Sequence, residues 1–548
     1  MDSPAPPPSG TTAWLRNALV LAVLAGVPGL LLATLMRPAV APHLPAVEKR
    51  SDVADAAQQV DAAFEKQWAA QGLTAVPRAD SLTVARRLSL ALTGSIPSLE
   101  EVRALEALPA EEVARRWLDR LLGDRRTADY LAERFTRVFT GTEDGPFLIY
   151  RRRRLVEWLA EALLKNRPYD QVVRELIASN GVWTTNPAVN FITVTNENQK
   201  GPDEVKLAAR VSRAFLGTRI DCVQCHDGKL GSPWKQTDFH QLAAFFGQAD
   251  FALNGLRDDP KDRYRNRYLG ETQEHEITAR VPWRPEALPA KGTPRQQLAT
   301  WVTATENRAF ARTIVNRVWA LLFNRPLVMP VDDIPHAGPF PPGMEELATD
   351  FIAHGHDLHR LIRVIAATRV FQLRSDSGDP VHPVGAEAEK AWAAFPVTRL
   401  RPEQMAGSII QAASLATLDA ETHVLFRLKR SADIANFVKR YGDTGEDSFE
   451  DGGGTIPQRL LLMNGNMVTN NVNSNPLVNA SSRIGMLAPD ARRAVEAAYL
   501  AIFTRMPSAE ESAHFEAILN AVKGKRRENA LSDLYWTLMN ATEFSWNH

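Results

Sequence analysis

The two cysteines of this 548-residue chain lie three positions apart, and a histidine follows the second one directly. They are Cys222 and Cys225 of the pentapeptide CVQCH, which ends at His226. This spacing is the attachment motif for a c-type haem. In such a site the two thiols bond to the vinyl groups of the porphyrin, and the adjacent imidazole ligates the iron from one axial side. The spacing therefore predicts covalently bound haem c, with His226 as the proximal ligand.

Other chemistry uses the same residue types. A local redox disulfide needs only the two thiols. A zinc site would need two further ligands, taken from distant histidines or carboxylates. A turn in which the cysteines are only structural needs no partner. These alternatives stay open on the sequence alone.

A haem iron has two axial positions, and His226 accounts for one of them. His240 lies one short loop downstream and is the nearest candidate for the second, although a histidine so close is more often hydrogen-bonded structure. Met329 and Met344 are more distant candidates. A filled second position favours electron transfer, whereas an open one favours the sensing of a small ligand.

Two predicted helices enclose the pentapeptide. One over 202–216 delivers the chain to the motif, and the next begins with Thr237 or Asp238 as its N-cap. Nearby aromatic residues offer apolar walls for a macrocycle, although aromatics at helical spacing are more often ordinary core. These aromatic residues are Trp234, Phe239, Phe245 and Phe246.

Apolar residues recur at helical spacing through most of the chain, which predicts a mainly α fold with at most a small β element. Capping boxes are expected at Ser98 with Glu101 and at Ser508 with Glu511. Segments 182–185 and 191–195 are predicted as extended or loop, 277–281 as a short strand, and 328–342 as an ordered loop. Helices are predicted over 53–68, 82–93, 111–122, 128–139, 150–165, 169–178, 310–323, 402–416, 457–463, 488–503 and 508–522.

The length exceeds what one hydrophobic core usually organises, so two folded units are expected. We predict one helical domain over 51–250, which contains the pentapeptide, a polar linker over 251–295, and a second helical domain over 296–548. The chain carries 64 basic and 64 acidic side chains, and this balance does not indicate a nucleic-acid partner. The pairs Arg86-Arg87 and Arg115-Arg116 are interpreted as solvated helix faces.

The N-terminal segment indicates where in the cell the protein is located. Residues 1–17 form a Pro-rich tail predicted to be disordered, 18–36 an uncharged apolar run long enough to span a bilayer, and 37–50 a linker. A cleaved signal peptide is the alternative, because Ala39-Val40-Ala41 has the small-x-small form. We expect an uncleaved transmembrane anchor. Because haem attachment of this kind implies export, the body is expected outside the cytoplasm, in a periplasm or at the cell surface.

His354, His356 and His359 form a second group of possible metal ligands, and two of them at i, i+3 would share a helix face. However, Gly355 and Asp357 are a helix stop signal and a helix start signal. We therefore expect this group to pack at a helix junction.

Several segments resemble a known pair of domains. The first set resembles the second type of planctomycete cytochrome-like domain, and consists of 86–97, 166–174, 215–227 and 234–246. The second set resembles the planctomycete secreted-protein domain that normally follows, and consists of 307–323, 355–362 and 455–464. The resemblance implies an exported protein that is cytochrome-like by motif, without an agreed activity. Many relatives carry a second histidine where this chain has Gly228, which argues against a ligand at that position.

The sequence thus predicts an exported, membrane-anchored c-type haem protein that transfers electrons with a redox partner protein or senses a small ligand. The alternative is a surface scaffold without haem, or a partner in extracellular polymer degradation, in which the CxxC is structural. No set of residues indicates a catalytic centre, so the sequence leaves enzymatic activity undecided.

Overall fold

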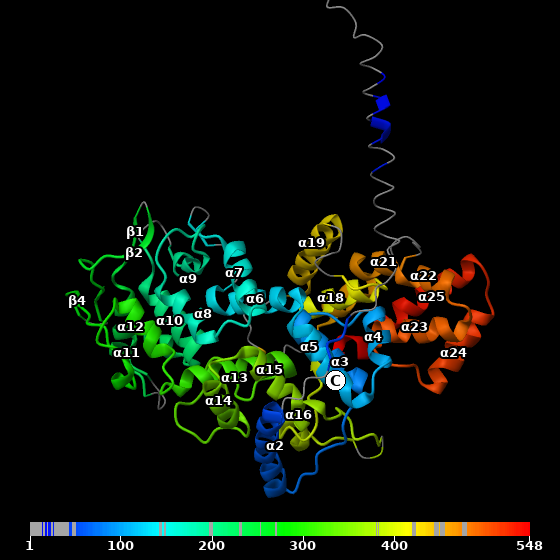
Figure 1. Cartoon of the computed structure of the whole chain (residues 1–548), viewed down its shortest axis with the longest axis horizontal. Coiled ribbons are helices and arrows are strands. Elements are labelled where there is room, and N and C mark those ends of the chain that lie inside the picture. The colour runs from blue at the N-terminus through cyan, green and yellow to red at the C-terminus, as the bar shows by residue number, and fades with distance from the viewer. Residues whose placement is uncertain are drawn as a thin grey trace, which may run out of the picture.

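Helices make up most of the protein in the computed structural model (Figure 1). The structure describes residues 14, 17–18, 20–22, 26, 43–46, 51–141, 145–146, 149–196, 201–228, 233–252, 254–268, 271–379, 381, 383–418, 424–442, 449, 455–473 and 479–548.

The first half of the chain contributes helices up to the pentapeptide and the one that follows it. They are α2 (Ser51–Gln71), α3 (Ser81–Thr93), α4 (Leu99–Glu106), α5 (Ala110–Leu122), α6 (Arg125–Thr140), α7 (Arg152–Leu164), α8 (Tyr169–Ala178), α9 (Asn190–Thr193), α10 (Glu204–Leu216) and α11 (Gln236–Ala243). Short 3₁₀ helices are η1 (Pro187–Val189), η2 (Ile220–Val223), η3 (Ala244–Phe246), η4 (Pro285–Ala287) and η5 (Glu543–Ser545).

The second half is helical as well. Its helices are α12 (Pro294–Val302), α13 (Arg308–Phe323), α14 (Met344–Ala353), α15 (Leu358–Ala367), α16 (Arg369–Gln372), α17 (Ala386–Lys390), α18 (Pro402–Ala412), α19 (Val424–Tyr441), α20 (Ile456–Asn464), α21 (Asn466–Val472), α22 (Ala480–Leu487), α23 (Ala491–Phe503), α24 (Ala509–Asn520) and α25 (Lys525–Met539).

The strands are short and pair as antiparallel two-stranded sheets. The pairs are β1 (Ala249–Ala252) with β2 (Gly255–Asp258), β3 (Arg265–Asn266) with β4 (His275–Glu276), and β5 (Thr398–Arg399) with β6 (Trp546–Asn547).

The helices predicted from apolar spacing are confirmed to within a few residues, as are both capping boxes. Two local predictions are wrong. Segment 191–195 is not extended, because Asn190–Thr193 forms α9, where the Asn190 side chain accepts the Arg151 N–H at 2.6 Å and donates to the Trp183 carbonyl at 2.9 Å. The strand expected over 277–281 is absent there, and β4 ends at Glu276.

The prediction of a membrane-spanning helix over 18–36 needs correction. A span needs roughly 20 consecutive apolar helical residues. Among the residues that the structure describes, no helix is long and apolar enough to cross a membrane. Most of 18–36, and of the tail and linker predicted on either side of it, lies outside the described residues. The fold class is therefore mainly helical with small sheets, and the described residues do not support the predicted N-terminal transmembrane helix.

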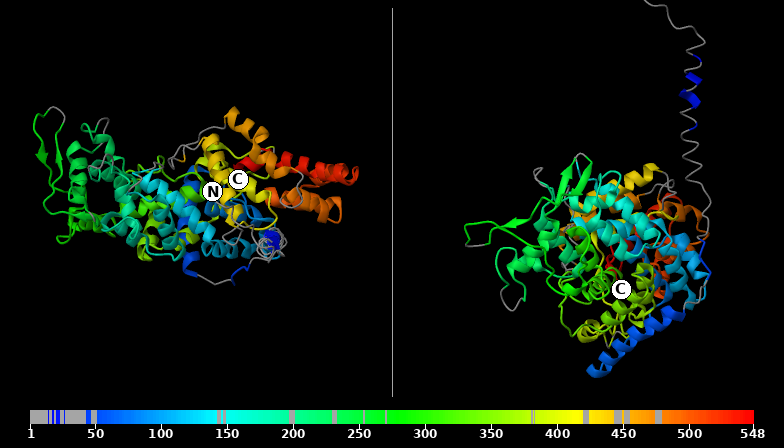
Figure 2. Two further views of the ribbon diagram at one scale, coloured as in Figure 1. Left: turned by 90° about the horizontal axis from the view of Figure 1, so that it is seen from above. Right: turned by 60° about the vertical axis from the view of Figure 1, so that its left-hand side comes forward.

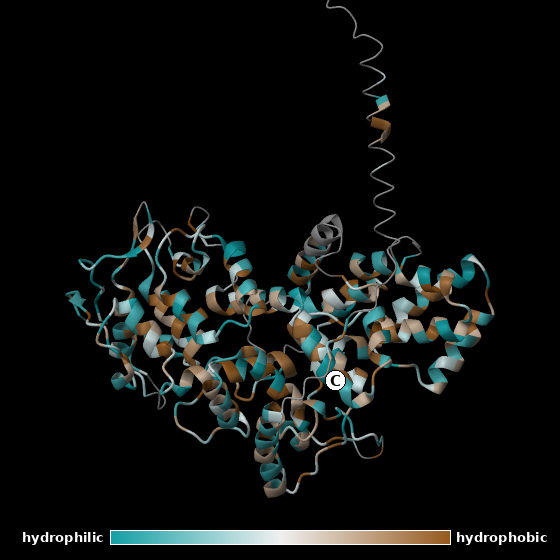
Figure 3. Ribbon diagram, viewed as in Figure 1, coloured by the Kyte–Doolittle hydropathy of each residue, from teal (hydrophilic) through white to brown (hydrophobic). Residues whose placement is uncertain are grey.

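Two hydrophobic clusters form the core. The first runs from Val53 to Phe395 and so includes helices on both sides of the segment predicted as a linker. The second contains residues between Leu400 and Phe544, together with Leu90 and Ile96. Figure 2 shows the green strands at one end of the long axis and the orange and red C-terminal helices at the other. In Figure 3 the apolar colouring is dense around α13 and α15, in the first cluster.

Helix α3 lies between the two clusters and is buried from Val84 to Leu92 on all faces. The interpretation of Arg86-Arg87 as a solvated face is therefore wrong. The Arg87 guanidinium, 1% exposed, donates to the carbonyls of Phe371 at 2.9 Å and Leu373 at 2.7 Å. It also donates to a His548 main-chain oxygen at 2.8 Å. Burial lowers the pKa of Arg87 to about 9.

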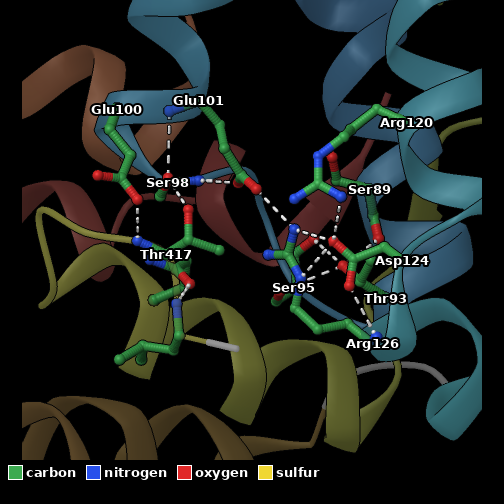
Figure 4. Close-up of polar contacts among 12 residues, drawn as sticks. Ser89, Thr93, Ser95, Ser98, Glu100, Glu101, Arg120, Asp124, Arg126 and Thr417 are labelled. Carbon is green, nitrogen blue, oxygen red and sulfur yellow. Dashed lines mark hydrogen bonds and ion pairs between the residues drawn. The ribbon is translucent and has the colours of Figure 1, made fainter. Parts of the chain in front are cut away.

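Polar contacts join the first helices to the chain that follows α18 (Figure 4). The Ser98 and Thr417 hydroxyls lie 2.9 Å apart, and the Thr417 N–H donates to the Glu100 carboxylate at 2.6 Å. The buried carboxylate of Glu101 accepts from Arg126 of α6 at 2.6 Å. The Thr417 contacts thus fix the segment after α18 against α4, and the Glu101 contact joins α4 to α6.

We predict that Arg87→Met lowers the free energy of unfolding by about 2–4 kcal/mol, because it leaves buried main-chain oxygens without their donors. Denaturation in urea measures this change. The matched control is Arg115→Met at an exposed position of α5, which should change stability by less than about 0.5 kcal/mol. Equal losses in the two variants would contradict the structural role of Arg87.

A second prediction concerns acid stability. The Glu403 carboxylate, whose side chain is 18% exposed, accepts from Arg134 at 2.8 Å and from Arg401 at 2.9 Å. Burial opposes ionisation of Glu403, but the two guanidinium charges outweigh it and lower its pKa to about 2. A carboxyl whose pKa is lower in the folded state stabilises the protein above its unfolded pKa, near 4.5, and loses this contribution as the pH falls toward 2.

Glu403→Gln should therefore reduce stability at neutral pH and flatten the pH dependence of stability below pH 4.5. Thermal melts at a series of pH values test this. Glu510→Gln, at an exposed position of α24, is the control and should follow the unmodified protein. A Glu403→Gln curve parallel to that of the unmodified protein would show that the carboxylate does not carry the dependence.

Candidate functional site

The pentapeptide begins where α10 ends. Gly217 terminates this helix in the left-handed conformation, with φ of 54°. A Cβ at this position would approach the Thr313 hydroxyl of α13 to 2.6 Å, so both the backbone angle and the close packing require glycine. The chain then forms η2, which contains Cys222, and continues through the turn with Cys225 and His226. The site thus lies between α10 and α11, at the end of the molecule opposite α21–α25 (Figure 1).

Both thiols are exposed and free. The Cys222 thiol donates to the Arg219 carbonyl at 2.9 Å. The exposed His226 ring places Nδ1 at 2.8 Å from the Asp227 carbonyl. A carbonyl oxygen only accepts, so Nδ1 carries the proton and Nε2 keeps its lone pair. An imidazole oriented by a carbonyl in this way is the usual form of a histidine ligand.

His240 supports the turn from inside. Its ring is buried, and its Nε2 lies 3.0 Å from the carbonyl oxygen of Gln224, the residue directly before Cys225. Its Nδ1 lies 2.7 Å from the Tyr264 hydroxyl. The carbonyl requires a proton on Nε2, so Nδ1 accepts from Tyr264. Burial lowers the pKa of His240, which keeps the ring neutral.

Both nitrogens of His240 are therefore engaged. Ligation of iron by His240 would break at least one of these hydrogen bonds, so the geometry favours support of the turn over the second axial position. The other candidates from the sequence are not brought to the turn by any contact among the described residues. Met344 is fully buried at the start of α14, and Met329 is exposed in the loop before Val331.

The loop 332–336, in the second half of the chain, docks on the residues that precede Cys222. The Ile334 N–H donates to the Gly217 carbonyl at 2.7 Å. Asp332 pairs with Arg219 at 2.7 Å and with Arg213 at 3.4 Å. Arg213 in turn binds Asp221 of η2, with a shortest distance of 2.7 Å. Backbone and charge contacts thus connect this loop to the turn.

His336 completes the contact. Its Nε2 lies 3.0 Å from the Thr218 hydroxyl oxygen, and its ring packs against Trp283 at 4.2 Å and Trp234 at 4.9 Å between centroids. Partial burial lowers the pKa of His336, the charge of Arg312 lowers it further, and Asp333 raises it.

Among the aromatic residues expected to line a macrocycle, only Trp234 is partly exposed next to the turn. Its carbonyl accepts the Gly228 N–H at 3.0 Å. Phe239, Phe245 and Phe246 are buried in the first cluster, as ordinary core.

The alternatives from the sequence differ in their fit to this geometry. A disulfide is not present between the two free thiols. In the part of the chain that the structure describes, the group of close metal-ligating atoms is Asp250, Asp259 and Asp262, which includes neither cysteine. A zinc site at the turn is thus not supported by neighbouring ligands, whereas two free thiols and an oriented imidazole fit haem attachment.

The three histidines of segment 354–359 lie at a helix junction, as expected, and each has different surroundings. His356 lies in the left-handed conformation between α14 and α15, and its ring packs against Phe310 and Phe351. His354 binds the Asp350 carbonyl, whereas His359 lines a small apolar cavity in the core.

Comparison with known families matches one segment in each half of the chain. Residues 59–251 match the PSCyt2 family model, described as a protein of unknown function (DUF1549), and residues 294–442 match PSD1, also described as a protein of unknown function (DUF1553). The chain thus contains a PSCyt2 match followed by a PSD1 match. No curated protein and no solved structure matches it significantly.

The resemblance seen in the sequence is thereby confirmed, with the PSCyt2 domain first and the PSD1 domain second. The CVQCH turn and His240 lie in the PSCyt2 domain, and the loop with His336 lies in the PSD1 domain. His336 was not predicted from the sequence, because it lies in a loop whose residues show neither helical nor strand periodicity. The signal available was a histidine inside a Pro- and Gly-rich segment already predicted to be ordered.

We predict that His240→Phe destabilises the turn, because the Gln224 carbonyl and the Tyr264 hydroxyl lose a partner each, at about 1–3 kcal/mol. Hydrogen exchange of 220–228 should accelerate, while exchange in α7 stays unchanged. Tyr264→Phe is the graded control, since it removes one hydrogen bond and keeps the bond to Gln224, so its effect should be smaller. Unchanged exchange in both variants would contradict the supporting role of His240.

Proposed function

We propose that the PSCyt2 domain binds haem c covalently through Cys222 and Cys225, with His226 Nε2 as the proximal iron ligand, and that the protein transfers electrons. The observation that carries this proposal is the arrangement of the turn. Both thiols are free and exposed, and the adjacent imidazole is held by the Asp227 carbonyl in the tautomer that leaves Nε2 available.

The attachment would consume two thiols of the chain and the two vinyl groups of one haem. Each S–H of Cys222 and Cys225 would add across one vinyl group, with a carbon–sulfur bond formed and the hydrogen transferred to the other vinyl carbon. No atom is lost and no net oxidation occurs. When bound, haem supplies a one-electron iron couple.

The residues of the chain position the attachment points. Val223 and Gln224 separate the two cysteines, and the Gln224 carbonyl accepts hydrogen bonds from His240 at 3.0 Å and from Gln236 at 2.9 Å. The Gln236 N–H binds the Asp227 carboxylate at 2.9 Å. These bonds fix the backbone on both sides of Cys225, so the spacing of the two sulfurs does not depend on the short η2 alone.

An exposed site supports exchange of electrons with a redox partner protein, because a partner reaches the attachment residues without rearrangement of the core. The proposed function includes export. Covalent attachment at a CxxCH motif implies a domain that acts outside the cytoplasm, in a periplasm or at the cell surface.

The absorption spectrum tests haem attachment. Protein produced in a host with haem-attachment machinery should show a Soret band that survives denaturation and extraction with acidified solvent. Cys222→Ser with Cys225→Ser should abolish the band completely. His354→Ala changes an exposed histidine far along the chain and should leave the band intact. A colourless unmodified protein with intact cysteines would favour the surface scaffold instead.

A further inference from the structure

The loop 332–336 of the PSD1 domain is hydrogen-bonded to 217–219, the residues directly before η2. Its contacts are a backbone bond from Ile334 to Gly217 at 2.7 Å, a backbone N–H of Arg219 to Asp333 at 3.4 Å, and the bond between His336 and Thr218 at 3.0 Å. The loop therefore has a defined register against the attachment segment.

The hydrogen bonds of Thr218 decide the tautomer of His336. The Thr218 hydroxyl donates its proton to the Leu216 carbonyl at 3.0 Å. The hydroxyl oxygen therefore accepts a hydrogen bond from His336 Nε2, which lies 3.0 Å away and carries the ring proton. The other nitrogen, Nδ1, keeps its lone pair. This is the arrangement of a histidine whose one nitrogen is fixed by a hydrogen bond while the other binds a metal.

His336 touches the chain on both sides of the pentapeptide. Thr218 precedes Cys222, and Trp234 follows His226 and is tied back to the turn through its bond with Gly228 at 3.0 Å. The ring of His336 packs on Trp234 and on Trp283, so it has little rotational freedom. The ring is nevertheless exposed to solvent rather than enclosed in the core.

We propose that Nδ1 of His336, supplied by the PSD1 domain, is the second axial ligand of the haem iron held by Cys222, Cys225 and His226. This inference rests on the proposed function and extends it. With histidine on both axial positions, the iron is low-spin and closed to small ligands, and the protein transfers electrons instead of sensing a small ligand. The site then needs both domains, because neither contains both histidines.

His336→Gln tests this proposal, because glutamine keeps similar length and an N–H for Thr218 but removes the imidazole. The haem-loaded full chain should be low-spin by electron paramagnetic resonance, and its ferrous form should not bind carbon monoxide. In His336→Gln we expect loss of the low-spin signal, a high-spin signal in its place and binding of carbon monoxide. Haem content by the pyridine haemochrome assay should stay equal to that of the unmodified protein.

The control is His354→Gln, which should remain low-spin and closed to carbon monoxide. If His336→Gln does not fold, His336→Ala with added imidazole is the second variant, and imidazole should restore the low-spin signal. A low-spin His336→Gln protein, or a high-spin unmodified protein with full haem content, would overturn the assignment of His336 and leave haem attachment intact. An unmodified protein without covalent haem would overturn both.

Discussion

The contact between the PSD1 loop and the start of η2 is the constraint on which the site depends. The pentapeptide follows a helix that ends at Gly217, and η2 is too short to hold its own position. Its backbone is instead fixed from outside, by Ile334 on Gly217 and by His240 on Gln224. Main-chain carbonyls of the turn and of the residue that ends α10 are thus bound by residues that lie later in the chain, which restricts the backbone of the turn.

The same dependence appears in the core. Apolar residues of the PSCyt2 and PSD1 domains share one hydrophobic cluster, and α3 of the first domain is enclosed between that cluster and the C-terminal helices. A guanidinium buried without an acidic partner is costly, and Arg87 offsets this cost by binding main-chain oxygens from three distant residues. The buried Arg295 also joins separate segments, but with an acidic partner, since it pairs with Asp258 at 2.6 Å and donates to the Ser179 carbonyl at 3.0 Å. Buried arginines therefore hold segments together that the sequence separates.

Sequence patterns predicted the helices, both capping boxes and the ordered loop, because each depends on residues close together in the chain. They misplaced what depends on tertiary contacts. Arg86 and Arg87 were interpreted as a solvated helix face, because the sequence does not show which main-chain carbonyls accept hydrogen bonds from them in the folded protein. The role of His240 needed the position of Tyr264, and His336 needed the docking of a loop more than one hundred residues away. The CVQCH motif could be found from the sequence alone, because it is defined by residue types at fixed, short spacing.

The central claim is that the free thiols of this turn carry haem. The most direct measurement is the intact mass of the full chain, purified from cells that mature a control c-type cytochrome, followed by mapping of the peptide that contains Cys222 and Cys225. The account predicts a mass increase equal to one haem per chain, located on that peptide and absent when both cysteines are serine. A mass equal to that of the bare polypeptide, with both thiols free, would contradict it.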